Sequence, residues 1–131
     1  MNKKKFLNFL GYKLREIEYR NKNKDEKEGE INIGIATNSK KDKDILQLMV
    51  TIVNNENFFK VVMLGIFELS ENLTEVEKEK FLNINGAAIL YPYIRSLISN
   101  ITAFDSPQAQ ILPTINFQKM YNNKKSENNF K

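Results

Sequence analysis

Residues 86–117, GAAILYPYIRSLISNITAFDSPQAQILPTINF, decide the fold of this chain. The first part of this stretch repeats apolar residues at the i, i+3, i+4, i+7 spacing of an amphipathic helix, which predicts one buried stripe. The opposite side of the helix is mostly small, so a second helix or a sheet could approach it closely. The stripe consists of Leu90, Ile94, Leu97, Ile98, Ile101 and Phe104, and the opposite side of Arg95, Ser96, Ser99, Asn100, Thr102 and Ala103.

Prolines and polar residues predict the limits of this helix. Pro92 lies near its start, where the missing N–H costs least, or else marks a kink. The Asp-Ser-Pro run at 105–107 predicts its end, and an extended segment containing Pro113 follows. Asn116 is a candidate N-cap for a short last helix carrying Phe117, Met120 and Tyr121.

The first half of the chain predicts four antiparallel strands joined by polar turns. Residues 12–19 alternate weakly and predict a strand, and the switch of face between Leu14 and Ile17 indicates a bulge or the end of a helical turn. Residues 30–35 alternate cleanly, whereas 45–53 and 58–69 are apolar on both faces. An antiparallel sheet usually has one wet face. Either a second copy therefore covers the other face, or an exposed apolar patch marks a binding site.

Composition fits one soluble domain, residues 1–131, with an ordered core of roughly 12–121 and a polar tail at 122–131. The chain has no cysteine and no histidine, which removes disulfides, the usual zinc sites, thiol nucleophiles and Ser-His-Asp arrangements. A carboxylate-based enzyme or a magnesium site remains formally possible, but the acidic residues lie in mixed runs with lysine. We therefore predict no catalytic residues, no metal and no cofactor.

The net charge of +4 would suit an acidic partner such as nucleic acid or an anionic membrane surface. Seventeen lysines against three arginines, spread along the chain, instead favour the biased composition of an AT-rich genome. We expect no nucleic acid partner. The longest apolar run, 61–67, is too short to span a bilayer. The basic N-terminal segment lacks the pattern of a signal peptide, which predicts a cytoplasmic protein.

Two motifs in the quoted stretch resemble the C-terminal half of the SecB protein-export chaperone family. That family carries an aromatic-Pro-Tyr-x-Arg run in its long helix, similar to YPYIR at 91–95 with Ile-Ser at 98–99. It also carries a Leu-x-Pro-Val-Asn-Phe-like segment before its last helix, similar to LPTINF at 112–117. Here leucine lies directly before the proline and isoleucine replaces valine. Gly-Ile-Phe at 65–67 resembles the run that ends the family's fourth strand.

The resemblance implies an α+β fold, in which a four-stranded antiparallel sheet is followed by a long helix and a short C-terminal helix. It implies a homotetramer, a dimer of dimers with the long helices between the sheets. The implied function is an ATP-independent holding chaperone that binds unfolded or nascent polypeptides in hydrophobic grooves. Its role would be protein export, or protection of a dedicated client such as the antitoxin of a toxin–antitoxin system. Classical members use acidic sheet residues to reach the SecA motor, so this basic chain predicts weak SecA docking.

Aromatic and flexible apolar side chains adapt to many client sequences, which makes them candidates for a groove. The groove candidates are Phe58, Phe59, Phe67, Phe117, Met120 and Tyr121, and ordinary core packing is the alternative for each. Fold and assembly are the expected roles of Tyr91, Pro92, Tyr93, Arg95, Ser96, Ser99, Asn100, Pro113 and Asn116. The alternative function is an oligomeric interaction module without chaperone activity, which could bind nucleic acid through its basic surface.

Overall fold

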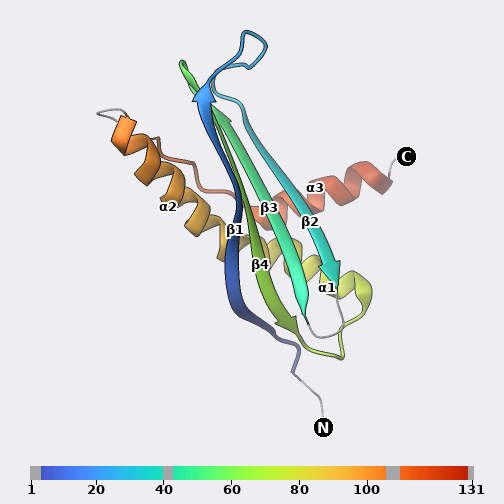
Figure 1. The fold of residues 1–131 in the computed structure, drawn as a ribbon. Coiled ribbons are helices and arrows are strands. Elements are labelled where there is room, and N and C mark those ends of the chain that lie inside the picture. The colour runs from blue at the N-terminus through green and yellow to red at the C-terminus, as the bar shows by residue number, and fades with distance from the viewer. Residues whose placement is uncertain (1–3, 40–42, 106–109, 130–131) are drawn as a thin grey trace.

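The computed structural model describes residues 4–39, 43–105 and 110–129, with side chains up to residue 124. The strands are β1 (Leu7–Asn21), β2 (Ile31–Ser39), β3 (Asp44–Val53) and β4 (Asn57–Leu69). The helices are α1 (Glu75–Phe81), the π-helix η1 (Leu82–Gly86), α2 (Ala87–Asp105) and α3 (Phe117–Asn129). The strands form one antiparallel sheet in the order β1-β4-β3-β2, and the helices lie on one of its faces (Figure 1). The predicted α+β fold is confirmed.

Two bulges explain the weak alternation of β1. One follows Phe9 and the other follows Leu14, and each inserts an extra residue into the strand. Leu14 therefore lies opposite Met63, and Ile17 lies opposite Val61. Because those two partners are two residues apart on β4, Leu14 and Ile17 share one face of the sheet. The predicted bulge is confirmed. The sequence pattern placed Leu14 and Ile17 on opposite faces, and the bulge instead brings them to the same face.

Strands β3 and β4 form the middle of the sheet, and their helix-facing side chains are buried. The fully buried ones include Leu46, Leu48, Val50, Val61 and Phe67. Half-buried apolar side chains occupy the opposite face, namely Ile45, Met49, Phe58, Leu64 and Ile66. The two-sided apolar character predicted for these strands is therefore present, while the described helices cover only one face of the sheet (Figure 1).

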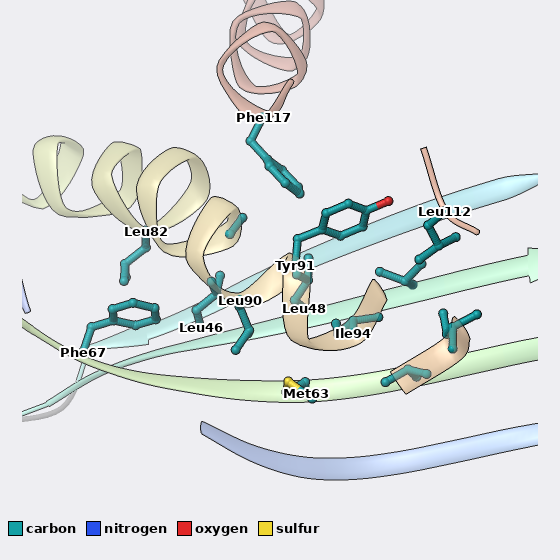
Figure 2. Close-up of a cluster of buried hydrophobic side chains, with 14 of the residues drawn as sticks. Leu46, Leu48, Met63, Phe67, Leu82, Leu90, Tyr91, Ile94, Leu112 and Phe117 are labelled. Atoms are coloured by element: carbon teal, nitrogen blue, oxygen red, sulfur yellow. The ribbon is translucent and has the colours of Figure 1, made fainter. Parts of the chain in front are cut away.

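Close packing at two glycines brings the helical layer onto the sheet. A Cβ atom on Gly65 would lie 2.6 Å from Cε2 of Phe67, and one on Gly86 would lie 3.2 Å from Cδ2 of Leu46. Phe67 is completely buried, and Figure 2 shows its ring in the apolar cluster near Leu82. Larger side chains at either glycine would have to displace this packed core. The Gly-Ile-Phe run at 65–67 therefore has a packing role.

The helix limits follow local sequence signals closely. In α1, Thr74 and Glu77 form a capping box, in which each side chain accepts a hydrogen bond from the other's backbone N–H. The predicted N-cap of α3 is also confirmed, because Oδ1 of Asn116 accepts a 3.0 Å hydrogen bond from the backbone N–H of Lys119. Pro92 lies inside α2 rather than at its first residue. The Ser and Pro of the predicted stop at 106–107 lie outside the described residues, and α2 ends at Asp105.

The buried stripe of α2 ends sooner than predicted. Leu90, Ile94 and Ile98 are fully buried, but Phe104 is 92% exposed. The last turn of α2 lies beyond the edge strand β1 in Figure 1, and residues 103–105 are all exposed. The Tyr19 hydroxyl of β1 donates a 2.7 Å hydrogen bond to Asp105 and holds this turn in place. Burial and this bond raise the pKa of Tyr19 to about 12, so the hydroxyl keeps its proton at neutral pH.

Both ends of the ordered region extend beyond their predicted limits. Strand β1 begins at Leu7 rather than at residue 12, because its first residues pair with the end of β4. Helix α3 continues to Asn129, through most of the segment predicted to be a polar tail. No helix in the described ranges is long and apolar enough to cross a membrane.

Candidate functional site

A groove of about 620 Å³ opens between β2 and α3. Its apolar side chains come from both elements and from the segment before α3, and they are Ile33, Ile35, Ile115, Phe117, Met120 and Tyr121. Its polar lining residues are Asn83, Thr114, Asn116, Lys119, Asn123 and Lys124. Concave surfaces with an apolar lining and a few polar groups are the usual binding sites of proteins.

Helix α3 presents one continuous stripe to this groove. Phe117, Met120, Tyr121 and Lys124 follow the i, i+3, i+4, i+7 spacing, so they lie along one side of the helix. The cap formed by Asn116 fixes where the helix begins, and therefore which residues face the groove. Phe117 is almost fully buried at the base of the stripe, whereas Met120 is half-buried and Lys124 is exposed. The stripe thus changes from buried and apolar to exposed and charged.

Strand β2 forms the other side of the groove and is an edge strand of the sheet. It pairs with β3 along its whole length, from Ile31 opposite Ile52 to Ser39 opposite Asp44. Ile33 and Ile35 lie on the helix-covered face and are half-buried. The order of the described strands leaves the far edge of β2 without a strand partner. An edge of this kind can pair with an added extended chain.

The extended segment at 110–116 connects α2 to α3 and fixes the groove. The Tyr91 hydroxyl donates a 2.7 Å hydrogen bond to the carbonyl oxygen of Pro113, and its ring meets Phe117 edge-on at 5.5 Å between centroids. Figure 2 shows Phe117 above Tyr91 in this arrangement. Burial raises the pKa of Tyr91, so its hydroxyl keeps its proton for this bond. At the other end of the segment, Thr102 accepts a 2.8 Å bond from the N–H of Gln110.

Replacing Tyr91 with phenylalanine is expected to lower the free energy of unfolding by about 1 kcal/mol, because the carbonyl of Pro113 loses its donor while the ring packing stays. Urea denaturation measures this change at one fixed protein concentration. Tyr93→Phe is the matched control, since that ring is 40% exposed, and it should change stability by less than half as much. Equal effects from both variants would show that the Tyr91 hydroxyl does not hold the segment.

The predicted groove residues separate into three groups. Phe117, Met120 and Tyr121 line the groove together. Phe59 and Phe67 lie instead in the core beneath the helices, as the core alternative describes. Phe58 lies on the opposite face of the sheet, 4.1 Å beneath the guanidinium of Arg20. Eight lining residues were not singled out from the sequence, namely Ile33, Ile35, Asn83, Thr114, Ile115, Lys119, Asn123 and Lys124. The clean alternation at 30–35 was the one signal available for the two isoleucines of β2.

The residues assigned to fold and assembly lie mainly along α2. Tyr91 and Pro113 are joined by the hydrogen bond above, and Tyr93 stacks on Tyr12 of β1 at 4.3 Å. The side of α2 away from the core is exposed or half-buried, and it contains Pro92, Arg95, Ser96, Ser99, Asn100 and Ala103. A small-residue surface is therefore open on the single chain.

The described residues contain no group of three or more acidic side chains placed to hold a metal ion. The groove offers apolar contact to a ligand, and lysine and amide side chains lie at its border. Such a site binds by burial and charge, and its lining includes no carboxylate for acid–base chemistry among the residues described.

Comparison with known proteins identifies one family and several relatives. Residues 15–128 match the family model described as preprotein translocase subunit SecB. An uncharacterized protein of Methanocaldococcus jannaschii is 34% identical over 104 residues, covering 71% of this chain and 66% of that protein. Protein-export protein SecB of Orientia tsutsugamushi is 31% identical over 78 residues, covering 58% of this chain and 48% of that protein. The chain thus spans about half to two thirds of the length of these relatives.

Solved structures share the fold at low sequence identity. One is a SecB-like chaperone of Mycobacterium tuberculosis in complex with a ChAD peptide from the HigA1 antitoxin, with a TM-score of 0.68 and 14% identity over 83% of this chain and 87% of that one. Another is a protein of unknown function from Streptococcus agalactiae, with a TM-score of 0.61 and 14% identity over 86% of this chain and all of that one. These likenesses establish a shared fold.

Proposed function

The chain belongs to the SecB family, and we propose from that premise that it is a holding chaperone, which binds unfolded polypeptide segments in the groove between β2 and α3. The observation that carries this proposal is the open apolar groove with flexible and aromatic side chains on its lining. Membership of the family and the relative named protein-export protein SecB support a chaperone role. Binding needs no ATP, since burial of apolar surface supplies the driving force.

Two features of the groove suit an extended client segment. The unpaired edge of β2 can form backbone hydrogen bonds with an added strand, which gives affinity without regard to sequence. The apolar side chains of α3 and β2 then receive alternate side chains of that strand. Because Met120 is unbranched and flexible, it can adapt to clients of different shape. The same groove would thus accept many unfolded segments.

Two kinds of client fit this proposal. The relative named as a protein-export protein supports a role in export, with nascent or unfolded precursors as clients. The structural neighbour that was solved with an antitoxin peptide supports a dedicated client in a toxin–antitoxin system. Both roles use the same groove, in the cytoplasm, without cofactor or catalysis, and neither requires more than weak docking to SecA.

We also propose that the chain assembles as a homotetramer. Each chain forms one domain over residues 1–131. Exposed apolar side chains gather along β1, where they need a cover in a soluble protein, and they are Leu10, Tyr12, Leu14 and Ile17. On α2, Tyr93 continues this surface through its stacking on Tyr12. The small side of α2 lies open and allows close approach of a second helix. These surfaces support contact between copies of the chain.

A charge placed on the small side of α2 is expected to reduce the assembly. Ser96 is exposed, so Ser96→Glu leaves the single chain intact but introduces a charge between copies that pack there. Size-exclusion chromatography with light scattering should give a smaller mass for this variant than for the natural chain. Glu79→Gln, on the exposed surface of α1, is the control and should leave the mass unchanged. An unchanged mass for Ser96→Glu would place the interface elsewhere.

Suppression of client aggregation tests the chaperone function. A urea-unfolded client is diluted into nucleotide-free buffer with and without the protein, and light scattering is followed. Scattering should fall in proportion to the added protein. This suppression should persist at high salt, since apolar capture does not depend on phosphate contacts. Scattering that the protein leaves unchanged would contradict the proposal. Capture that disappears with salt would favour the alternative of a basic interaction module.

A further inference from the structure

The border of the groove carries positive charge from two lysines. Lys119 and Lys124 both line the groove, and its described lining contains no carboxylate. Lys124 follows Phe117 by seven residues, which places it on the same side of α3, about 10 Å farther along the helix. The four ion pairs among the described side chains use neither lysine. Among the described side chains, no carboxylate neutralises either ammonium group.

We propose that the groove prefers client segments in which an apolar, aromatic-containing core is flanked by aspartate or glutamate. This inference rests on the proposed chaperone function and names the class of client that the groove selects. The apolar core of the client packs on Phe117, Met120 and the isoleucines of β2, and its flanking carboxylates approach Lys119 and Lys124. Lysine or arginine at the same flanks would meet a like charge and lose affinity.

The arrangement of the lining supports selection by charge as well as by apolar contact. Its other polar members are asparagine and threonine side chains, which carry no charge to oppose the lysines. Asn83 reaches the groove from η1, and its amide nitrogen donates a 2.8 Å bond to the carbonyl oxygen of Glu79. This amide adds no charge to the lining. Positive charge thus dominates the described border of the groove.

Two synthetic 15-residue peptides test the preference by fluorescence anisotropy with the full chain. They share one Leu/Phe/Ile core and differ only in two glutamates or two lysines at each end. The acidic peptide should bind about fivefold more tightly at low salt, since each exposed ion pair contributes modestly. The difference should shrink at high salt, while the apolar part of the affinity remains.

Three variants assign the preference to the groove. Lys119→Gln with Lys124→Gln should reduce the difference between the two peptides to less than about twofold. Lys119→Arg with Lys124→Arg keeps both charges and should restore the preference. Lys24→Gln with Lys27→Gln removes the same charge from the loop between β1 and β2, outside the groove lining, and should leave the preference intact. Circular dichroism checks that each variant is folded.

The outcomes separate this inference from the function on which it rests. Equal binding of both peptides, or tighter binding of the basic one, would overturn the charge preference and leave capture in the groove standing. A preference lost equally in the Lys24/Lys27 variant would also overturn it, because net charge alone would then explain the difference. Binding of neither peptide would contradict the proposed function and the inference together.

Discussion

Replacing Phe67 with alanine is expected to lower the free energy of unfolding by about 4 kcal/mol. The ring is completely buried and contacts the space above both Gly65 and Gly86, where the helical layer approaches the sheet most closely. It also packs on Phe9 of β1 at 5.4 Å between centroids. Alanine removes apolar burial and leaves a cavity that the rigid surroundings fill only in part.

Phe58→Ala is the matched control for this change. Phe58 lies on the same strand and has the same side chain, but it is half-buried on the open face beneath Arg20. We expect it to cost about 1–2 kcal/mol, since part of its surface is already in contact with water. Urea denaturation at one fixed protein concentration compares the two, because assembly makes stability depend on concentration. A smaller loss at Phe67 than at Phe58 would contradict the assignment of Phe67 to the core.

Polar substitutions in the groove are expected to weaken capture of unfolded client at least about tenfold. The double variant Ile35→Thr with Met120→Gln keeps the β-branch at residue 35 and the unbranched length at residue 120. It places a hydroxyl and an amide where apolar client groups pack. Both residues are only half-buried in the chain, so the fold should tolerate the change. Anisotropy of a labelled unfolded client measures the affinity, and circular dichroism confirms folding.

The opposite face of the sheet supplies an equivalent control. Ile45 and Met49 of β3 are the same two residue types, are also half-buried, and lie outside the groove between β2 and α3. The variant Ile45→Thr with Met49→Gln should therefore capture client like the natural chain. If this control loses affinity and the groove variant does not, clients bind the open face of the sheet and the groove is excluded as the site.

Local signals predicted the helical half of the chain well. The stripe of Leu90, Ile94 and Ile98 and the N-cap at Asn116 depend on residues within one or two turns, so sequence alone contains them. Phe104 follows the same spacing but is exposed, because burial there depends on where α2 crosses the edge of the sheet. That crossing is a tertiary property.

The groove was predictable only in part for the same reason. Phe117, Met120 and Tyr121 share one side of a short helix, and spacing alone places them together. Their partners Ile33 and Ile35 belong to a strand whose position at the sheet edge, beside α3, follows from strand order. No local pattern reports strand order. The π-helix η1, which brings Asn83 to the groove, has no sequence signature either.

The start of β1 shows how pairing overrides local composition. The sequence predicts an ordered core that begins near residue 12, and Asn8 interrupts the apolar residues before that point. In the fold, Leu7 pairs with Leu69 and Phe9 with Phe67. The long strand β4 therefore provides backbone hydrogen-bond partners for the first residues of β1. The side chains of Leu7 and Phe9 therefore lie on the covered face of the sheet. Asn8 lies on the other face, where its amide nitrogen donates a hydrogen bond to the carboxylate of Glu68.

Native mass spectrometry of the pure protein, alone and with an equimolar urea-unfolded client, tests capture most directly. We expect a species of about 61 kDa, four chains of 15.3 kDa each, that gains the mass of the unfolded client and ignores the same client in its native state. Capture by a species of another mass would correct the assembly and keep the chaperone function. A protein that takes up no unfolded client at any mass would contradict the proposed function, and the family likeness would then describe a shared fold alone.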